Sequence, residues 1–224
     1  MKAIIFDSGV LINMSLNGFF HILEPLRKIS ECKFLITKQV KYEIVDRPLK
    51  IPRFELGALR IRDLIDRKII EMPDILGIGD KEIVSKMDYF MNKANHLVQV
   101  NGRWIEIVSE GEMSCLALSS ILFEKSIDNL IGVDERTTRI LAENPREIEK
   151  VISNKIHQNT KMIKSDLSDF YKFKFIRTSE ILYSAFKLGL INIKDPKALE
   201  ACLYASKFSG ASISFEEIDI LKKL

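Results

Sequence analysis

The sequence has few of the residues that build disulfide scaffolds or zinc sites. Only three of its 224 residues are cysteine and three are histidine, and it contains neither a CxxC nor an HExxH motif. The cysteines are odd in number and far apart, which predicts buried, reduced thiols. The histidines are isolated and lack the spacing of a zinc site or a catalytic triad. Chemistry based on zinc or on a histidine triad is therefore not expected.

Long apolar runs are also missing. No stretch approaches the roughly 20 apolar residues that a membrane-spanning helix needs. The first residues lack the basic segment, apolar segment and small-residue cleavage site of a secretory signal. We therefore expect a cytoplasmic protein without membrane contact.

The composition that is present is that of a globular protein. Hydrophobic residues make up 46% of the chain and charged residues 29%, with a formal net charge of +3. This weak basic excess neither requires nor excludes a nucleic-acid partner. No repeat or flexible linker divides the chain, so we expect one domain over residues 1–224.

Short apolar runs alternate with segments of helical periodicity, which predicts an α/β fold. Strands are expected at residues 3–6, 33–36, 129–133 and 175–177. Helices are expected from a cap at Ser15 or Asn17 to Ile29, from Thr37 to Pro48, and over residues 56–70, 80–96 and 109–125. Asn101-Gly102 predicts a β-hairpin. The pattern indicates a three-layer α/β/α sandwich with a central parallel sheet.

Four acidic residues occupy positions where such a fold can bring them together. Asp7 and Asp134 each follow a predicted strand, and the carboxyl ends of parallel strands meet at one edge. Glu43 lies beside the inward face of its short helix, and Glu112 opens the helix at 109–125. Three of them have a simpler interpretation. Asp7 suits a turn or helix cap, Glu43 a solvent-facing position on a short helix, and Glu112 a capping box with Ser109.

A cluster of these carboxylates would require a cation. At an effective dielectric constant of 20, two like charges 4 Å apart repel by about 4 kcal/mol. Hard oxygen ligands in this number suit Mg²⁺ or Mn²⁺. We therefore predict a metal site at Asp7, Glu43, Glu112 and Asp134, with Glu135 as a further ligand and the first four as catalytic residues.

The stretches that carry these acids resemble the motifs of the PIN-domain family of nucleases. The resemblance lies in IIFDSGVLI, the Glu43 helix, GEMSCLALS and IGVDERTTRILAE, in that order. It is greatest to the archaeal and bacterial branch, in which a GE-x-x-A-type helix precedes a D-[DE]-R strand end. It implies core motifs at residues 1–48 and 109–193, with insertions at about 49–108 and 145–174.

The resemblance also implies a function. Family members have a PIN-like α/β/α fold and an acidic Mg²⁺ or Mn²⁺ site, and usually cleave single-stranded RNA. Many are toxins of toxin–antitoxin pairs, so RNA, a homodimer partner and an antitoxin protein are the implied partners. The expected activity is that of a metal-dependent endoribonuclease acting on phosphodiester bonds.

One departure from the family and one further resemblance keep other functions open. Family members often carry a second acid two residues after the glutamate of the GE helix, where this chain has Ser114. The segment IIFDSGVLI also resembles the first motif of haloacid-dehalogenase-type phosphatases, but these need a second aspartate where this chain has Gly9. A catalytically silent PIN-like module that binds RNA or protein is the third possibility.

Overall fold

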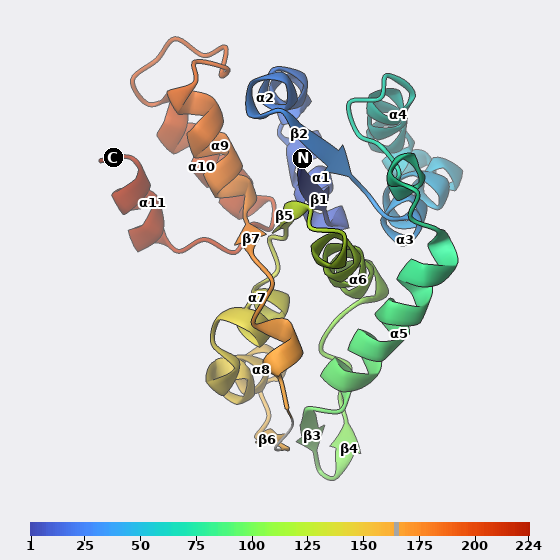
Figure 1. Cartoon of the computed structure of the whole chain (residues 1–224). Helices are drawn as coiled ribbons and strands as arrows, with labels where there is room; N and C mark the ends of the chain where they lie inside the picture. Colours follow the sequence, from blue (N-terminus) through green and yellow to red (C-terminus); the bar gives the residue numbers. More distant parts are fainter. Residues whose placement is uncertain (164–165) are drawn as a thin grey trace.

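The computed structural model describes residues 1–163 and 166–224. Its main sheet has four parallel strands in the order β2-β1-β5-β7. Their bounds are Cys32–Leu35, Lys2–Phe6, Asp128–Gly132 and Phe175–Ile176. Helices flank the sheet on both faces (Figure 1), so the chain is a three-layer α/β/α sandwich, as the sequence pattern predicts.

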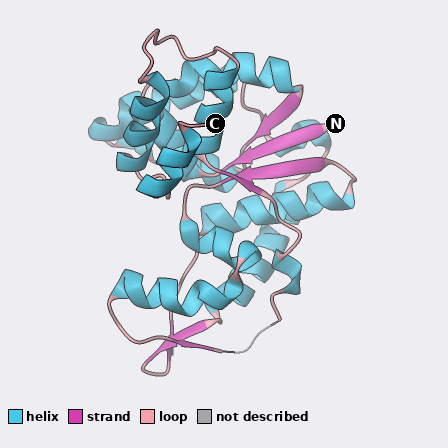
Figure 2. Cartoon of the chain, turned by 90° about the vertical axis from the view of Figure 1, so that its left-hand side faces the viewer, coloured by secondary structure: helices cyan, strands magenta, loops and turns pink. Residues whose placement is uncertain are grey.

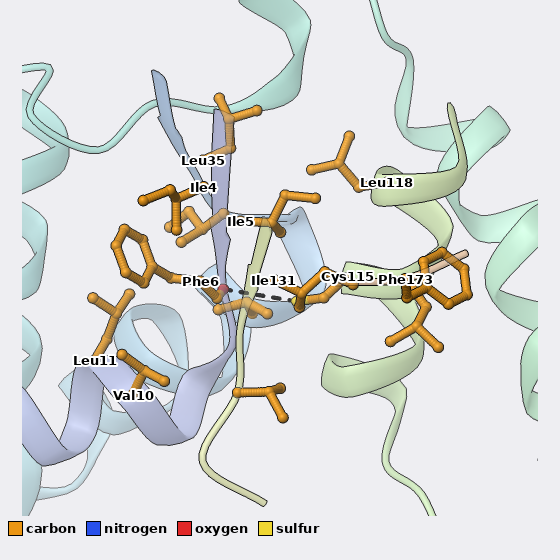
Figure 3. Packing of buried hydrophobic residues seen from close by; sticks show 14 of the residues in the cluster. Ile4, Ile5, Phe6, Val10, Leu11, Leu35, Cys115, Leu118, Ile131 and Phe173 are labelled. Atoms are coloured by element: carbon orange, nitrogen blue, oxygen red, sulfur yellow. Dashed lines mark hydrogen bonds between the residues drawn. The ribbon is translucent and has the colours of Figure 1, made fainter. Parts of the chain in front are cut away.

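Strand β1 is the centre of this sheet and is buried on both faces. It pairs in parallel with β2 on one side and β5 on the other, with Phe6 opposite Gly132. Ile5 and Phe6 have no exposed surface. Figure 3 shows Ile131 and Cys115 packed beside them, with the Cys115 thiol 3.7 Å from the Phe6 carbonyl oxygen. The unbroken apolar run of β1 is explained by this two-sided burial.

The segment after β1 differs from the expectation. A helix was expected to start at Ser15 or Asn17, but α1 (Ser8–Leu16) begins directly after Asp7, whose side chain accepts a hydrogen bond from the Gly9 amide. Gly18, with φ of +71°, then breaks the chain before the 3₁₀ turn Phe19–Ile22 and α2 (Leu23–Ser30). Asp7 is therefore a helix cap. Gly18, in the left-handed region, changes the direction of the chain after α1.

The helix that carries Glu43 is present but irregular. Thr37 caps α3 (Lys38–Lys41) by accepting a hydrogen bond from the Val40 amide. The chain then widens into a π-helical turn, Tyr42–Asp46, closed by a 3.0 Å hydrogen bond from the Arg47 amide to the Tyr42 carbonyl. A 3₁₀ turn, Pro48–Lys50, ends the segment. The π turn changes which side chains share a face, relative to a regular helix.

The two expected insertions meet in a second sheet, which Figure 2 shows at the bottom of the view. The hairpin of β3 (Val98–Val100) and β4 (Arg103–Trp104) pairs with β6 (Lys161–Met162) in the order β4-β3-β6. Asn101 and Gly102 both have positive φ, as a type I′ turn requires. The predicted hairpin is confirmed, and residues from both insertions hold it.

The remaining helices follow the apolar periodicity. They are α4 (Pro52–Asp66), α5 (Asp80–Asn95), α6 (Glu110–Glu124), α7 (Arg136–Glu143), α8 (Ile148–Ile156), α9 (Thr178–Lys187), α10 (Ala198–Phe208) and α11 (Phe215–Leu221). Helix α6 packs on β1 and β5 and is almost wholly buried. Within the described ranges, no helix is long and apolar enough to cross a membrane.

One buried polar contact connects α6 to the start of β5. The Asn129 amide oxygen accepts a 2.6 Å hydrogen bond from the Ser119 hydroxyl, and the amide nitrogen donates to the Ile127 carbonyl at 3.0 Å. Both side chains are about 2% exposed or less. Buried polar groups are costly when they lose their partners.

We expect Asn129→Ala to lower the free energy of unfolding by about 1–3 kcal/mol, because it leaves the buried Ser119 hydroxyl without an acceptor. Urea denaturation followed by circular dichroism measures this. The exposed Asn192 provides the matched control, Asn192→Ala, which should change stability by less than about 0.5 kcal/mol. Equal stability of the two variants would show that the contact contributes nothing.

Candidate acidic site

Asp7 lies at the carboxyl edge of the sheet and is only 4% exposed. The parallel register fixes it there, since its backbone amide donates to the Gly132 carbonyl at 2.9 Å. The Gly9 amide donates to Oδ2 at 3.2 Å, and the Ser8 hydroxyl lies 3.4 Å from Oδ1. Its carboxylate therefore caps α1 and still has lone pairs available for another ligand.

Glu112 lies close to Asp7 and has two roles in the geometry. Its Oε2 accepts a 2.9 Å hydrogen bond from the Ser109 amide, and the Ser109 hydroxyl accepts one from the Glu112 amide. The predicted capping box is thus confirmed. Glu112 is also 8% exposed and its charge acts on Asp7. Capping and membership of an acidic cluster are compatible for this residue.

Glu43 completes this cluster because α6 has no side chain at Gly111. A Cβ at Gly111 would lie 2.6 Å from Oε2 of Glu43 and 2.9 Å from Oε1. The Gln39 side chain donates to Oε1 of Glu43 at 3.2 Å and to Glu110 at 2.9 Å. Gly111 therefore lets the carboxylate on the π turn lie directly against the first turn of α6.

The charges of Glu112 and Glu43 both act on Asp7. Burial first, and then the charges of Glu112 and Glu43, raise the pKa of Asp7 to about 7, against the lowering effect of the Gly9 and Ser8 amides. Burial also raises the pKa of Glu112. The nearby Cys115 thiol has a raised pKa because of burial and then the charges of all three acids. Such clustered, perturbed groups are typical of functional sites.

Asp134 has different partners. Its two oxygens accept hydrogen bonds from the Thr178 amide at 2.8 Å and the Thr178 hydroxyl at 2.7 Å. Burial raises the pKa of Asp134, while Thr178 and then Arg139 and Arg177 lower it. Asp134 therefore fastens the end of β5 to the start of α9, and the charges of the two arginines act on it.

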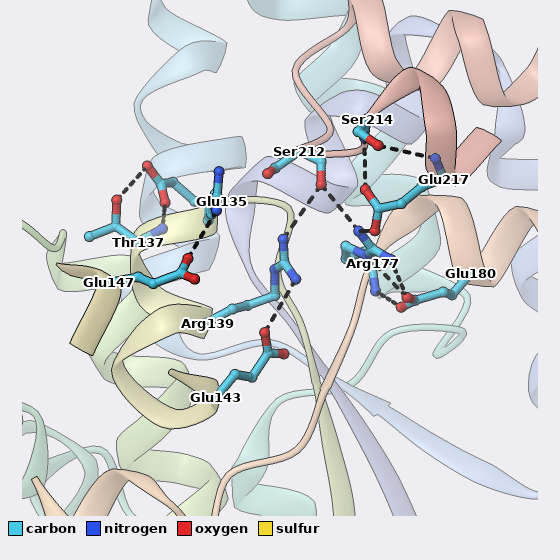
Figure 4. A network of polar contacts seen from close by, with 11 residues as sticks. Glu135, Thr137, Arg139, Glu143, Glu147, Arg177, Glu180, Ser212, Ser214 and Glu217 are labelled. Carbon is cyan, nitrogen blue, oxygen red and sulfur yellow. Dashed lines mark hydrogen bonds and ion pairs between the residues drawn. The ribbon is translucent and has the colours of Figure 1, made fainter. Parts of the chain in front are cut away.

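These arginines belong to a network that Figure 4 shows beside the C-terminal segment. Arg177 binds Glu180 and Glu217 at 2.7 Å each, and donates to the Ser212 carbonyl at 3.3 Å. Arg139 donates to the same carbonyl at 3.5 Å, and its Nε is buried without a partner among the described atoms. The network fixes residues 211–214 over the end of β5, where the Ser212 amide donates to the Asp134 carbonyl.

Glu135 follows Asp134 in the chain and has its own partners. It caps α7 through the Thr137 amide and pairs with Lys155 of α8 at 2.7 Å. Its charge raises the pKa of Glu112. The Thr138 hydroxyl is buried beside Glu112 and has no well-formed hydrogen bond within the described residues. Glu112 is therefore influenced by Glu135 and Thr138 of the α7 segment as well as by its own helix.

The charges of Glu112 and Glu43 thus act on Asp7, and that of Glu135 acts on Glu112, whereas Asp134 is turned toward Thr178. Within residues 1–163 and 166–224, no group of three or more His, Cys, Asp or Glu side chains has the arrangement of a metal site. A shared ion at the predicted residues thus stays a prediction. Ser114 donates to the Gly111 carbonyl at 2.6 Å and contacts the Thr37 hydroxyl, so it joins α3 to α6.

The chain matches no protein-family model, and no curated protein or solved structure is significantly similar to it.

Sequence reasoning missed three residues that shape this site: Gln39, Gly111 and Thr178. Gln39 is on the same helix as Glu43 at a spacing of four, which is a signal for a side-chain hydrogen bond. A glycine in the first turn of a helix signals close approach of another group. Thr178 carries no such signal in the sequence. Only the fold shows that its partner is Asp134.

The raised pKa of Asp7 predicts a pH-dependent stability difference. An acid with a folded pKa of about 7 and an ordinary value of 3.8 stabilises the fold fully below pH 3.8 and loses this contribution as the pH rises through 7. Asparagine cannot ionise and caps helices as well as aspartate. Asp7→Asn should therefore gain stability relative to the parent chain between pH 4 and 8, by up to roughly 4 kcal/mol.

Urea denaturation in chelator at several pH values measures this difference. The exposed Asp74 provides a matched control, Asp74→Asn, which removes a carboxylate that lies outside this site. A flat difference for Asp7→Asn would mean that the Asp7 carboxyl titrates normally in the folded state.

Proposed function

We propose that the protein is a Mg²⁺- or Mn²⁺-dependent endoribonuclease that cleaves phosphodiester bonds in single-stranded RNA, as the resemblance to the PIN-domain family implies. The observation that supports this is the cluster of Asp7, Glu43 and Glu112 at the carboxyl edge of a parallel sheet. This edge is the usual ligand-binding location in open α/β folds. A toxin role, a homodimer and an antitoxin partner belong to the same proposal as expectations.

The donor chemistry of the cluster fits a hard divalent cation. Its members are carboxylates, and each of the three accepts only one or two protein hydrogen bonds. Burial and mutual repulsion raise the pKa of Asp7 and so disfavour its charged form in the absence of a counter-charge. A divalent ion would relieve this repulsion, and carboxylate oxygens are the ligands that Mg²⁺ and Mn²⁺ prefer.

Each residue would have a distinct role in the reaction. A bound divalent ion supplies an activated water and stabilises the charge that develops on the phosphodiester. Asp7 and Glu112 would hold that ion on the rigid β1 and α6 termini, and Glu43 would complete the site from the π turn. Asp134 would have a structural role, because its hydrogen bonds from Thr178 hold the end of β5 against the start of α9.

Two other functions compete with this one. A haloacid-dehalogenase-type phosphatase would use Asp7 as a nucleophile, but the second aspartate of that mechanism is absent and its position is held by Gly9. A silent RNA- or protein-binding module is favoured by the engagement of both Asp134 oxygens with Thr178. An assay that compares RNA cleavage, phosphate release from small esters and RNA binding separates the three functions.

We expect Asp7→Asn to lower the rate of Mn²⁺-dependent cleavage of single-stranded RNA at least about 100-fold, since it removes a central carboxylate of the site. Cleavage is measured by gel electrophoresis of a labelled RNA, with and without chelator. Asp74→Asn should cleave at the parent rate. Unchanged turnover in Asp7→Asn would remove this carboxylate from the chemistry.

Gly111→Ala tests the position of Glu43 without removing any acid. The added Cβ meets only the end of the flexible Glu43 side chain, so the fold should persist while the carboxylate moves away. We expect the rise in melting temperature on adding Mn²⁺ to shrink and the melting temperature in chelator to stay or increase. At Gly79 a Cβ meets nothing within 4 Å, so Gly79→Ala is the control. An undiminished response to Mn²⁺ in Gly111→Ala would exclude Glu43 as a ligand.

A further inference from the structure

A cavity of about 350 Å³ opens next to the acidic site, between α1, the π turn and α4. Glu43 is one of its lining residues, so the cavity and the site share a wall. Its volume is within the range of pockets that bind small organic groups. Whatever occupies it would lie directly beside the carboxylate cluster.

Apolar side chains form much of the cavity wall, and several of them are exposed to solvent. Leu16 is 70% exposed, Phe54 50% and Ile12 43%. They come from α1 and α4, which pack against each other below the opening. Phe54 is the aromatic side chain of this wall and is half exposed. An exposed aromatic on an apolar wall is a suitable surface for stacking a flat ring.

Two cations line the same cavity. Arg47 follows the π turn and Arg53 lies in the first turn of α4. Neither forms an ion pair with a carboxylate in the part of the chain that the structure describes, whereas Lys38, Lys41 and Arg67 nearby in the sequence each do. The Arg53 guanidinium lies 5.4 Å from the Phe54 ring centroid. Unpaired arginines beside an acidic cluster fit a ligand that is itself anionic.

The π turn explains why Arg47 is unpaired. In a regular helix, Glu43 and Arg47 would be i, i+4 partners on one face and would attract each other. The hydrogen bond from the Arg47 amide to the Tyr42 carbonyl spans five residues instead of four. Glu43 lies against Gly111 and Gln39, and Arg47 lines the cavity. The same turn therefore provides a carboxylate to the site and a cation to the cavity.

We propose that this cavity binds the nucleotide next to the scissile phosphodiester, an inference that depends on the proposed nuclease function. The base stacks on Phe54 against the apolar wall, and Arg47 and Arg53 contact the flanking phosphates. A single strand carries flat apolar bases on an anionic backbone, which matches an aromatic wall edged with unpaired cations. An apolar peptide would leave both arginines without partners.

The test measures RNA binding separately from cleavage. A short fluorescein-labelled oligouridylate is titrated with the protein by fluorescence anisotropy, with Ca²⁺ in place of Mn²⁺, at several salt concentrations. Phe54→Ala should weaken binding about tenfold without changing the salt dependence, because it removes stacking only. Arg47→Ala and Arg53→Ala should each reduce the slope of log K against log salt by about 0.7, the value for one phosphate contact on a single strand.

Two matched controls lie outside the cavity. Arg62 is exposed on α4 and does not line the cavity, and Phe208 is 78% exposed at the end of α10. Arg62→Ala and Phe208→Ala should bind the oligonucleotide with the affinity and salt slope of the parent chain. Equal losses in the controls and the cavity variants would overturn the proposal, because the effect would then be one of general charge or apolar surface.

The proposal and the nuclease function can fail separately. If the cavity variants bind and cleave RNA like the parent chain while Asp7→Asn does not cleave, the nuclease function stands and the cavity proposal is wrong. If the parent chain neither binds nor cleaves RNA, both are wrong. If Phe54→Ala converts a dimer into a monomer in light scattering with unchanged RNA affinity, the cavity belongs to an interface with a second copy, and the nucleotide proposal is overturned.

Discussion

The parallel register between β1 and β5 is the constraint on which the rest of the site depends. Phe6 lies opposite Gly132, and the next residue, Asp7, donates its amide to the Gly132 carbonyl. A shift by one residue would exchange the side chains that face the two helix layers, which are close-packed around the present arrangement. The register therefore fixes where the strand ends, and so where a carboxylate emerges between α1 and α6. Burial of that carboxylate follows from the same packing that stabilises the sheet.

The acidic cluster opposes this packing, and local irregularities allow it to exist. Regular structure would give Glu43 a partner in Arg47 and would give α6 a side chain at residue 111. The π turn separates Glu43 from Arg47, and Gly111 leaves α6 without a side chain at that position. The Glu43 carboxylate can therefore approach the first turn of α6. Functional sites are where π turns and close glycine contacts concentrate. Here both occur at one point of contact between two helices, and they place an unpaired cation on the adjacent cavity.

Much of the fold could be predicted from the sequence because it depends on local patterns. The four strands, the capping box of Ser109 and Glu112, and the Asn101-Gly102 hairpin each have a short-range physical cause. The site was harder to predict. Proximity of Asp7 to Glu112 follows from strand order, but the turn of Asp134 toward Thr178 depends on a contact 44 residues away. The start of α1 was missed because Asp-Ser-Gly fits a turn and a helix cap equally well, and only the packing of Val10, Leu11 and Met14 decides between them.

The position of Asp134 bears directly on which acids could hold an ion. Turning it toward Asp7 would break two hydrogen bonds to Thr178 in a buried environment, where each unmade bond costs about 1–3 kcal/mol. It would also remove a negative charge from Arg139 and Arg177, which repel each other. Glu135 would lose only an exposed pair with Lys155 and a helix cap. If the proposed cation binds, Glu135 would join it at lower cost than Asp134, whose bonds to Thr178 hold β5 and α9 together.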